Sequence, residues 1–179
     1  AWMSGGALCV ATDYSVSDVS DAANAKQYVP CVHTAAESRL LPAESLYALP
    51  AGGEGCAVLG AYSLDEPAQR NAVAVYGAEA KNVYAVPGSI FLTDTRSVSA
   101  ESRRMSDDKG SYTEYAELVC TDLFRFDYDA SGIRLGSSGI VSGVLPEKSA
   151  IAPFGSGYVC VSEVSGSYLR MYEGKGGPV

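Results

Sequence analysis

Histidine and tryptophan are nearly absent from this chain, and charged side chains are scarce. The 179 residues include one histidine, one tryptophan and 19% Asp, Glu, Lys and Arg. None of the five cysteines forms a C-x-x-C pair, and His33 is the only imidazole, so a zinc centre has almost no ligands to draw on. The formal net charge is −8. An acidic chain without a basic cluster repels phosphate backbones, which argues against nucleic acid as a partner.

Long apolar runs and the common catalytic motifs are absent as well. No stretch of about 18 apolar residues is present, so this segment is not expected to insert into a membrane. The first residues, Ala1 to Ser4, lack the features of a signal peptide, and we interpret the chain as a segment of a longer protein. There is no G-x-S-x-G elbow, no G-x-G-x-x-G or Walker loop, and no sialidase box. We therefore predict no catalytic, cofactor-binding or metal-binding residue.

Short alternating strands separated by turns are what the sequence does contain. Val, Tyr, Gly and Ser are abundant, which favours strands and tight turns over long helices. Apolar alternation predicts an all-β fold. The predicted strands cover residues 7–12, 56–64, 71–76, 82–86, 89–93, 115–128 and 133–144, a hairpin within 150–164, and 168–172. In the long strand at 115–128, the candidate apolar positions are Leu118, Cys120, Phe124 and Phe126.

Two regions lack this alternation. Residues 13–55 are rich in Asp, Ser, Ala, Pro and Gly, and they read as a surface insertion with one edge strand near 44–48. Within it, Asp18 could cap one or two helical turns that end at Gln27. Residues 97–112 are charged and rich in serine, which predicts a mobile loop.

The turn-then-strand signal recurs. It occurs at Leu8, Ile90 and Tyr158, at intervals of about 80 and 70 residues. Between Ile90 and Tyr158 the order of strands and turns indicates a four-stranded antiparallel unit. Such a unit is the blade of a β-propeller. The predicted architecture is a partial propeller of about two to three blades within a single domain fragment, residues 1–179.

A family resemblance is carried by a succession of short motifs. These are AVLGAYSLDEP (57–67), VYG (75–77), NVYA (82–85), SIFL (89–92), TDLFRF (121–126) and GIVSG (139–143). The succession resembles the secreted bacterial proteins with a C-terminal β-propeller, which are distantly related to WD repeats. The family usually continues with a Phe-Ser-Met-type strand and an acidic turn, where this chain has KSAIAPFGSGY (148–158). Propellers close with at least four blades. We therefore expect either further blades outside this segment or self-association through open edges.

Several acidic groups invite a chemical interpretation. DYDASG (127–132) resembles the start of a calcium loop, but its twelfth position is Ser138 and no helix flanks it, so a hairpin turn is the favoured interpretation. Loop acids and an amide could gather around a cation, although a solvated loop explains them equally: these are Asp13, Asp18, Asp21 and Asn24. A carboxylate pair for glycoside hydrolysis could come from Glu114, Glu117 and Asp122, although a charged strand face explains the same pattern.

The remaining candidates are a histidine, the cysteines and the tyrosines. His33 lacks the partners of a triad and reads as a lone surface histidine. Cys9, Cys120 and Cys160 read as buried free thiols, whereas Cys31 and Cys56 are the best candidates for a disulfide. Tyrosine offers an apolar face and a polar tip, so a sugar- or peptide-stacking surface could form. Its candidate members are Tyr14, Tyr28, Tyr47, Tyr62, Tyr112, Tyr115 and Tyr168.

The function expected from these observations is a noncatalytic module, secreted or anchored at the cell surface, that binds protein or glycan. The alternative is an extracytoplasmic hydrolase or lyase with a propeller fold. A purely structural role in a larger surface protein is a third possibility. Fold alone does not decide among these, because propellers serve enzymes and binding modules alike.

Overall fold

The computed structural model describes residues 1–16, 19–33, 37–50, 55–66, 68, 70–164 and 166–172, and β-strands dominate them. The helical elements in these residues are three short 3-10 turns: η1 (Ala25–Gln27), η2 (Ala43–Ser45) and η3 (Ala80–Asn82). None of them is long and apolar enough to cross a bilayer. The all-β prediction is confirmed.

Two open sheets form the body of the molecule. The first, sheet A, has the order β1-β2-β6-β7-β5 and is antiparallel except for β5, which runs parallel to β7. Its strands are β1 (Trp2–Ser4), β2 (Ala7–Asp13), β5 (Leu46–Ala48), β6 (Cys56–Ser63) and β7 (Arg70–Tyr76). The edge strand predicted inside the insertion is β5, which lies at one border of this sheet.

The second sheet, sheet C, is an antiparallel meander with the order β11-β10-β9-β8. Its strands are β8 (Val83–Val86), β9 (Ser89–Asp107), β10 (Gly110–Asp129) and β11 (Gly132–Ser142). A four-stranded unit was expected here, but its fourth strand is β8 rather than the strand after residue 144. The turn predicted at Pro87-Gly88 is present, and Gly88 adopts the positive φ of 75° that such a turn requires.

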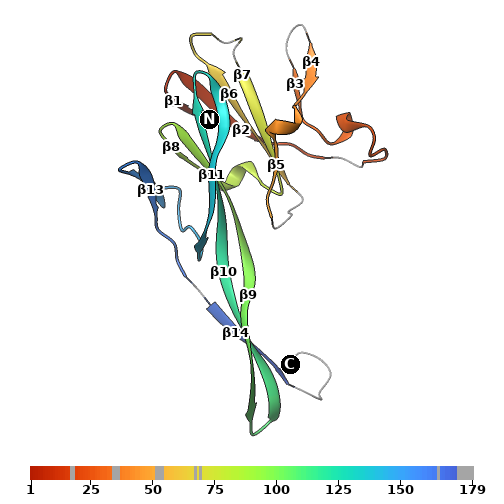
Figure 1. Ribbon diagram of the computed structural model, residues 1–179, viewed down its shortest axis with the longest axis vertical. Coiled ribbons are helices and arrows are strands. Elements are labelled where there is room, and N and C mark those ends of the chain that lie inside the picture. The colour runs from red at the N-terminus through yellow and green to blue at the C-terminus, as the bar shows by residue number, and fades with distance from the viewer. Residues whose placement is uncertain are drawn as a thin grey trace.

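The two sheets pack face to face around one apolar core (Figure 1). On β6, the odd-numbered residues from Ala57 to Ala61 face this core, because successive side chains of a strand point to opposite faces. From sheet C, the fully buried Ile90, Leu92 and Phe126 point into it. The Phe126 ring meets Tyr47 edge-on, with ring centroids 5.6 Å apart. The alternation read from the sequence is therefore the alternation that fills this core.

Further layers cover the outer faces of both sheets. Residues of the insertion pack on the outer face of sheet A, where Val29 and Leu41 meet Cys56 and Ala74. The outer face of sheet C is covered by a two-stranded ribbon that follows it in the chain, with Ile151 packed near Phe91. The ribbon strands are β12 (Ile151–Phe154) and β13 (Gly157–Cys160). The order of layers is insertion, sheet A, sheet C and ribbon.

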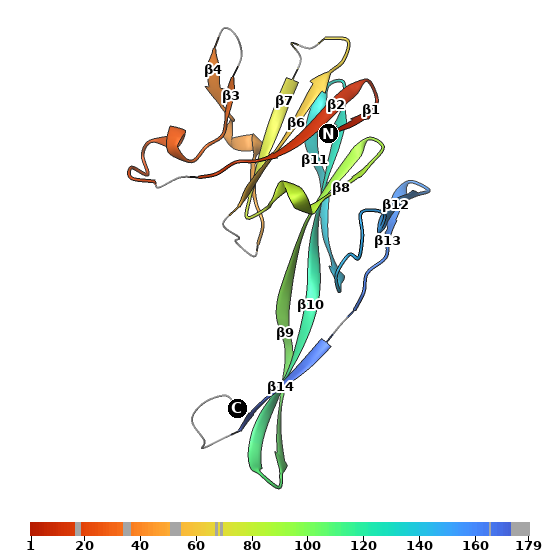
Figure 2. The same cartoon turned by 180° about the vertical axis from the view of Figure 1, so that it is seen from behind.

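The region predicted as a mobile loop, residues 97–112, is strand, so that prediction is wrong. β9 and β10 stay paired out to Asp107 and Gly110 and project from the body as a long arm (Figures 1 and 2). We define the arm as residues 97–119, which lie beyond the end of β11. β14 (Gly166–Tyr172) pairs with β10 along it. The serine-rich sequence hides these strands because backbone hydrogen bonds hold them without a buried apolar face.

The propeller itself is not confirmed. Neighbouring propeller blades pack face to face, but so do the sheets of a β-sandwich. None of the sheets described here closes. The architecture is an open stack of antiparallel β layers.

Candidate binding cleft

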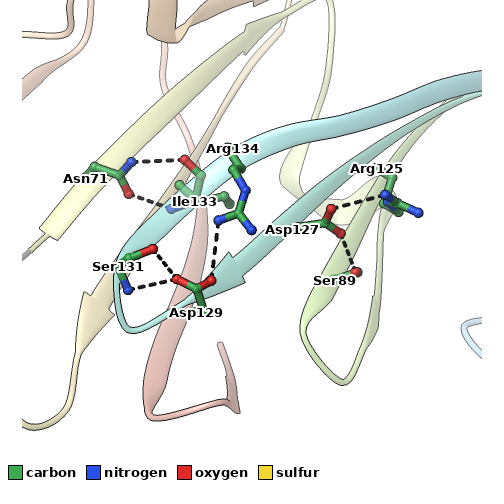
Figure 3. Close-up of polar contacts among 8 residues, drawn as sticks. All are labelled: Asn71, Ser89, Arg125, Asp127, Asp129, Ser131, Ile133 and Arg134. Atoms are coloured by element: carbon green, nitrogen blue, oxygen red, sulfur yellow. Dashed lines mark hydrogen bonds and ion pairs between the residues drawn. The ribbon is translucent and has the colours of Figure 1, made fainter. Parts of the chain in front are cut away.

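The calcium-like sequence at residues 127–132 forms the hairpin turn between β10 and β11 (Figure 3). Asp129 Oδ1 accepts hydrogen bonds from the Ser131 backbone N–H (2.8 Å) and from the Ser131 hydroxyl (2.5 Å). These bonds, helped by Arg134, lower the pKa of Asp129. Asp127 accepts from Ser89 Oγ at 2.7 Å and from Arg125 Nη2 at 3.1 Å. Protein donors occupy both carboxylates, which supports the turn interpretation over a cation loop.

Asn71 joins this turn to the other sheet (Figure 3). Its Nδ2 donates to the Ile133 carbonyl at 3.0 Å, and its Oδ1 accepts from the Ile133 N–H at 2.7 Å. Gly132 has a φ of 133°, and a Cβ at this position would collide with the Asn71 amide. This amide therefore fixes β11 against β7, and the cluster is structural.

The proposed carboxylate pair does not form. β10 runs without interruption from Glu114 to Asp122, because the extra residue at the register shift lies on β9. Eight residues of strand separate the two acids by roughly 27 Å, whereas glycosidase carboxylates lie about 5–10 Å apart. Asp122 is buried and forms an ion pair with Arg96 at 2.6 Å, and Glu114 pairs with Arg170 at 3.1 Å. Each of these two carboxylates therefore forms an ion pair with an arginine on a neighbouring strand.

The predicted cation ligands of the insertion accept backbone hydrogen bonds instead, Asp13 from a distant segment and the others from local turns. Asp13 Oδ1 accepts from the Ala80 N–H at 2.6 Å, Asp21 accepts from the Ala23 N–H at 3.0 Å, and Asn24 caps η1 through the Lys26 N–H at 3.3 Å. The predicted cap Asp18 lies outside the described residues. Within the described part of the chain, no three His, Cys, Asp or Glu side chains gather as metal ligands.

All five cysteines are free thiols, so the predicted Cys31–Cys56 disulfide is absent. Cys56 is buried on the outer face of sheet A, and burial raises its pKa to about 11. Cys9 is buried in the core between the sheets, with its pKa raised to about 11 in the same way. Cys31, Cys120 and Cys160 are half-buried.

A cleft lies where the insertion stands over the outer face of sheet A. Its roof is a short ribbon of β3 (Cys31–His33) and β4 (Ser38–Leu40), which projects beside β7 (Figure 1). The larger chamber, about 580 Å³, is lined by Thr12, Asp13, Tyr14, Lys26, Cys31, His33 and Ser38 among others. A second chamber of about 230 Å³ shares Thr12, Cys31 and His33 with it and extends to Tyr62 and Arg70. We call the two chambers together the cleft.

An aromatic platform forms one end of this cleft. Tyr62 lies against Gly60, where an added Cβ would come within 3.3 Å of the Tyr62 ring. Glycine thus lets the ring approach the sheet closely, and 38% of Tyr62 remains exposed. Arg70 stands directly opposite Tyr62 on the neighbouring strand, so the two side chains share one face.

His33 lies in the middle of the cleft and Tyr14 lies in the larger chamber, away from Tyr62. Tyr14 lines the larger chamber, and its backbone N–H donates to the Cys56 carbonyl at 2.7 Å, which fixes the chain there. His33 is exposed, as expected, and its Nδ1 lies 2.7 Å from the Ser38 hydroxyl across the ribbon. This contact orients the imidazole at the junction of the two chambers. Two tyrosines and several hydrogen-bonding groups therefore line one continuous cleft.

The other predicted tyrosines do not join this surface. Tyr47 packs in the core against Phe126. Tyr28 packs between the insertion and the outer face of sheet A, and its carbonyl accepts a hydrogen bond from the Tyr76 hydroxyl at 2.7 Å. Tyr112 and Tyr115 are on the arm, and the side chain of Tyr168 lies outside the described part. Of the seven candidates, the structure brings Tyr14 and Tyr62 to the cleft. Arg70 and Lys26 were not singled out from the sequence. Arg70 is separated along the chain from Tyr62, and Lys26 from Tyr14, and no sequence motif links either pair.

Comparison with known proteins identifies no relative: no family model, curated protein or solved structure matches the chain. The resemblance to secreted bacterial propeller proteins therefore stays a prediction.

Proposed function

We propose that this chain is a noncatalytic, extracytoplasmic interaction module that binds a glycan in the cleft between the β3–β4 ribbon and sheet A. The observation that carries the proposal is the combination of Tyr62, partly exposed and close to Gly60, with Tyr14 in the same cleft. Sugars present an apolar face that stacks on aromatic rings and hydroxyls that need hydrogen-bonding partners. Thr12, Ser38 and His33 supply such partners between the rings.

A noncatalytic role is supported by the state of the acidic side chains. Asp122 and Glu114 are neutralised by arginines and lie far apart on β10. Among the described residues that line the cleft, Asp13 is the one carboxylate, and glycoside hydrolysis needs two. No observation favours the hydrolase or lyase alternative.

The test is a glycan array probed with the chain and with two variants. We expect Tyr62→Ala to lose most of the binding, since a stacked aromatic contributes about 1 kcal/mol beyond its buried area. Tyr115→Ala is the matched control, because this half-buried tyrosine lies on the arm. Binding to no glycan, or equal binding by the Tyr62→Ala variant, would contradict the proposal. A peptide array run in parallel would identify a protein ligand instead.

We also propose that the layers belong to a β-propeller in which the β12–β13 ribbon begins a third sheet. The ribbon covers sheet C with one face and leaves the other apolar: Phe154 is 72% exposed and Val161 is 64% exposed. Exposed apolar sheet faces mark contact surfaces. An open stack should therefore self-associate through this face. Sedimentation equilibrium should show dimers or larger species that Phe154→Glu converts to monomer, and a wild-type chain that stays monomeric at high concentration would count against the third layer.

A further inference from the structure

The charge of the cleft is opposite to the charge of the molecule. The whole chain carries 21 acidic and 13 basic side chains. In the part of the chain that the structure describes, the cleft is lined by one acid, Asp13, and by two basic residues, Lys26 and Arg70, together with His33, the single histidine of the chain. A fold with this net charge leaves a local positive field in the cleft only if the basic groups there outnumber the acids around them and form no ion pairs with them.

The contacts of these side chains meet that condition. Among the described residues, neither Lys26 nor Arg70 forms an ion pair, whereas Arg96, Arg125, Arg134 and Arg170 all do. Asp13 accepts a hydrogen bond from the Ala80 N–H, which directs one of its carboxylate oxygens toward the start of η3. Arg70 also lines a third cavity with Glu37 and Arg39, and this second acid and second arginine together add no net charge.

The positions of the two cations also fit one ligand. Lys26 lines the larger chamber with Tyr14, and Arg70 lines the smaller chamber opposite Tyr62. His33 lies at the boundary that the chambers share. Each tyrosine is thus accompanied by a cation in its chamber, which is the arrangement that an anionic sugar needs: a ring face for stacking and a charge-assisted donor for its substituent.

We propose that the cleft selects glycans that carry an anionic substituent, a carboxylate or a phosphate on the sugar, over neutral glycans. This inference rests on the proposed function. Arg70 would bind the oxyanion through its planar fork of donors, and Lys26 would act as a second, point-like charge. A preference of this kind falls with ionic strength, because exposed charges are screened.

Calorimetric titration with three oligosaccharides of equal length tests the inference: one of uronic acids, one with sugar phosphates and one neutral. We expect the anionic ligands to bind at least about tenfold more tightly than the neutral one, with the difference shrinking in high salt. The variants Arg70→Gln and Lys26→Gln should remove that preference, because they should weaken the anionic ligands at least about tenfold more than the neutral one. Arg134→Gln, which changes an exposed cation that does not line the cleft, is the control.

The outcomes separate the two proposals. Equal binding of neutral and anionic ligands, lost in Tyr62→Ala, would overturn the anionic preference and leave the glycan cleft intact. Binding of none of the three at low salt would overturn both. A preference that Arg134→Gln reduces as much as Arg70→Gln would show that net charge, and not the cleft, provides it, and would also overturn the inference. Comparison of the uronic acid with the sugar phosphate identifies the substituent.

Discussion

The two ends of the β stack differ in chemistry. At the insertion end, sheet A carries a cleft with tyrosines, hydroxyls and unpaired cations. At the ribbon end, the outer face of β12–β13 presents Ala152, Phe154, Val159 and Val161 and carries no charge. A polar, concave end suits a small hydrated ligand, and a flat apolar end suits another sheet. The comparison teaches that two ends of one stack of similar layers differ in polarity, and our two proposals assign a different contact to each end.

The largest expected effect is on the free energy of unfolding, and it distinguishes a phenylalanine buried between the sheets from one exposed at the ribbon end. Phe126 is fully buried between the sheets, so Phe126→Ala should lower the free energy of unfolding by about 3–5 kcal/mol. Phe154→Ala at the ribbon end should change it by less than about 0.5 kcal/mol at low protein concentration. Urea unfolding measures both. Equal losses would show that the ribbon face is covered in the folded molecule.

Thiol reactivity should distinguish the accessible cleft from the part of sheet A that the insertion covers. Cys31 lines the cleft, whereas Cys56 lies beneath the insertion with a pKa near 11. A pKa two units above the usual value lowers the thiolate fraction about 100-fold near neutral pH. We expect Ellman's reagent to modify Cys31 quickly and Cys56 and Cys9 slowly. The fast phase should decrease in Cys31→Ser, and rapid modification of Cys56 would mean that the insertion does not seal this face.

Loss of the hydrogen bonds between Asn71 of sheet A and Ile133 of sheet C should have a smaller effect on the free energy of unfolding. Asn71→Ala removes both hydrogen bonds to Ile133 and leaves its backbone groups without this partner. We expect a loss of about 1–3 kcal/mol in the free energy of unfolding. Asn82→Ala, on η3 away from this joint, serves as the control. No difference between the two variants would show that apolar packing alone positions β11.

The smallest effect is a pH dependence at the β10–β11 turn. The pKa of Asp129 is lower in the folded chain than in the unfolded chain, so the carboxylate stabilises the fold above its unfolded pKa. This contribution disappears as the pH falls through the folded pKa. Because the side chain is 46% exposed, Asp129→Asn should cost less than about 1 kcal/mol at neutral pH and nothing at strongly acidic pH. Thermal unfolding across that range checks both points, and a cost that persists in acid would exclude the charge as its cause.

The parts of the fold that were predictable are those where one strand face is buried. β6 and β7 alternate because their odd-numbered residues fill the core between the sheets, and that alternation is visible in the sequence. Residues 97–112 of the arm were not predicted as strand because few of the described side chains there are buried, Tyr112 being an exception. The strand predicted at 115–128 does continue onto the arm, where Leu118, a predicted apolar position, is 41% exposed. Backbone pairing leaves no signal in side-chain type.

The cleft was predictable only in fragments. The sequence names Tyr62 and Tyr14 as aromatic candidates, and Gly60 two residues before Tyr62 on an apolar strand is the one local sign of a close ring contact. Arg70 faces Tyr62 only through the β6–β7 register, and His33 reaches the site because the insertion folds back over sheet A. These contacts depend on the tertiary structure, and a short stretch of sequence does not predict them.

Amide hydrogen exchange with and without a uronic acid oligosaccharide tests the central claim most directly, since it reports on both ends of the stack at once. The account predicts slower exchange in β3 and at the ends of β2 and β6 that line the cleft, with no change in β12 and β13. Protection of β12 and β13 by the sugar, with none at the cleft, would contradict it.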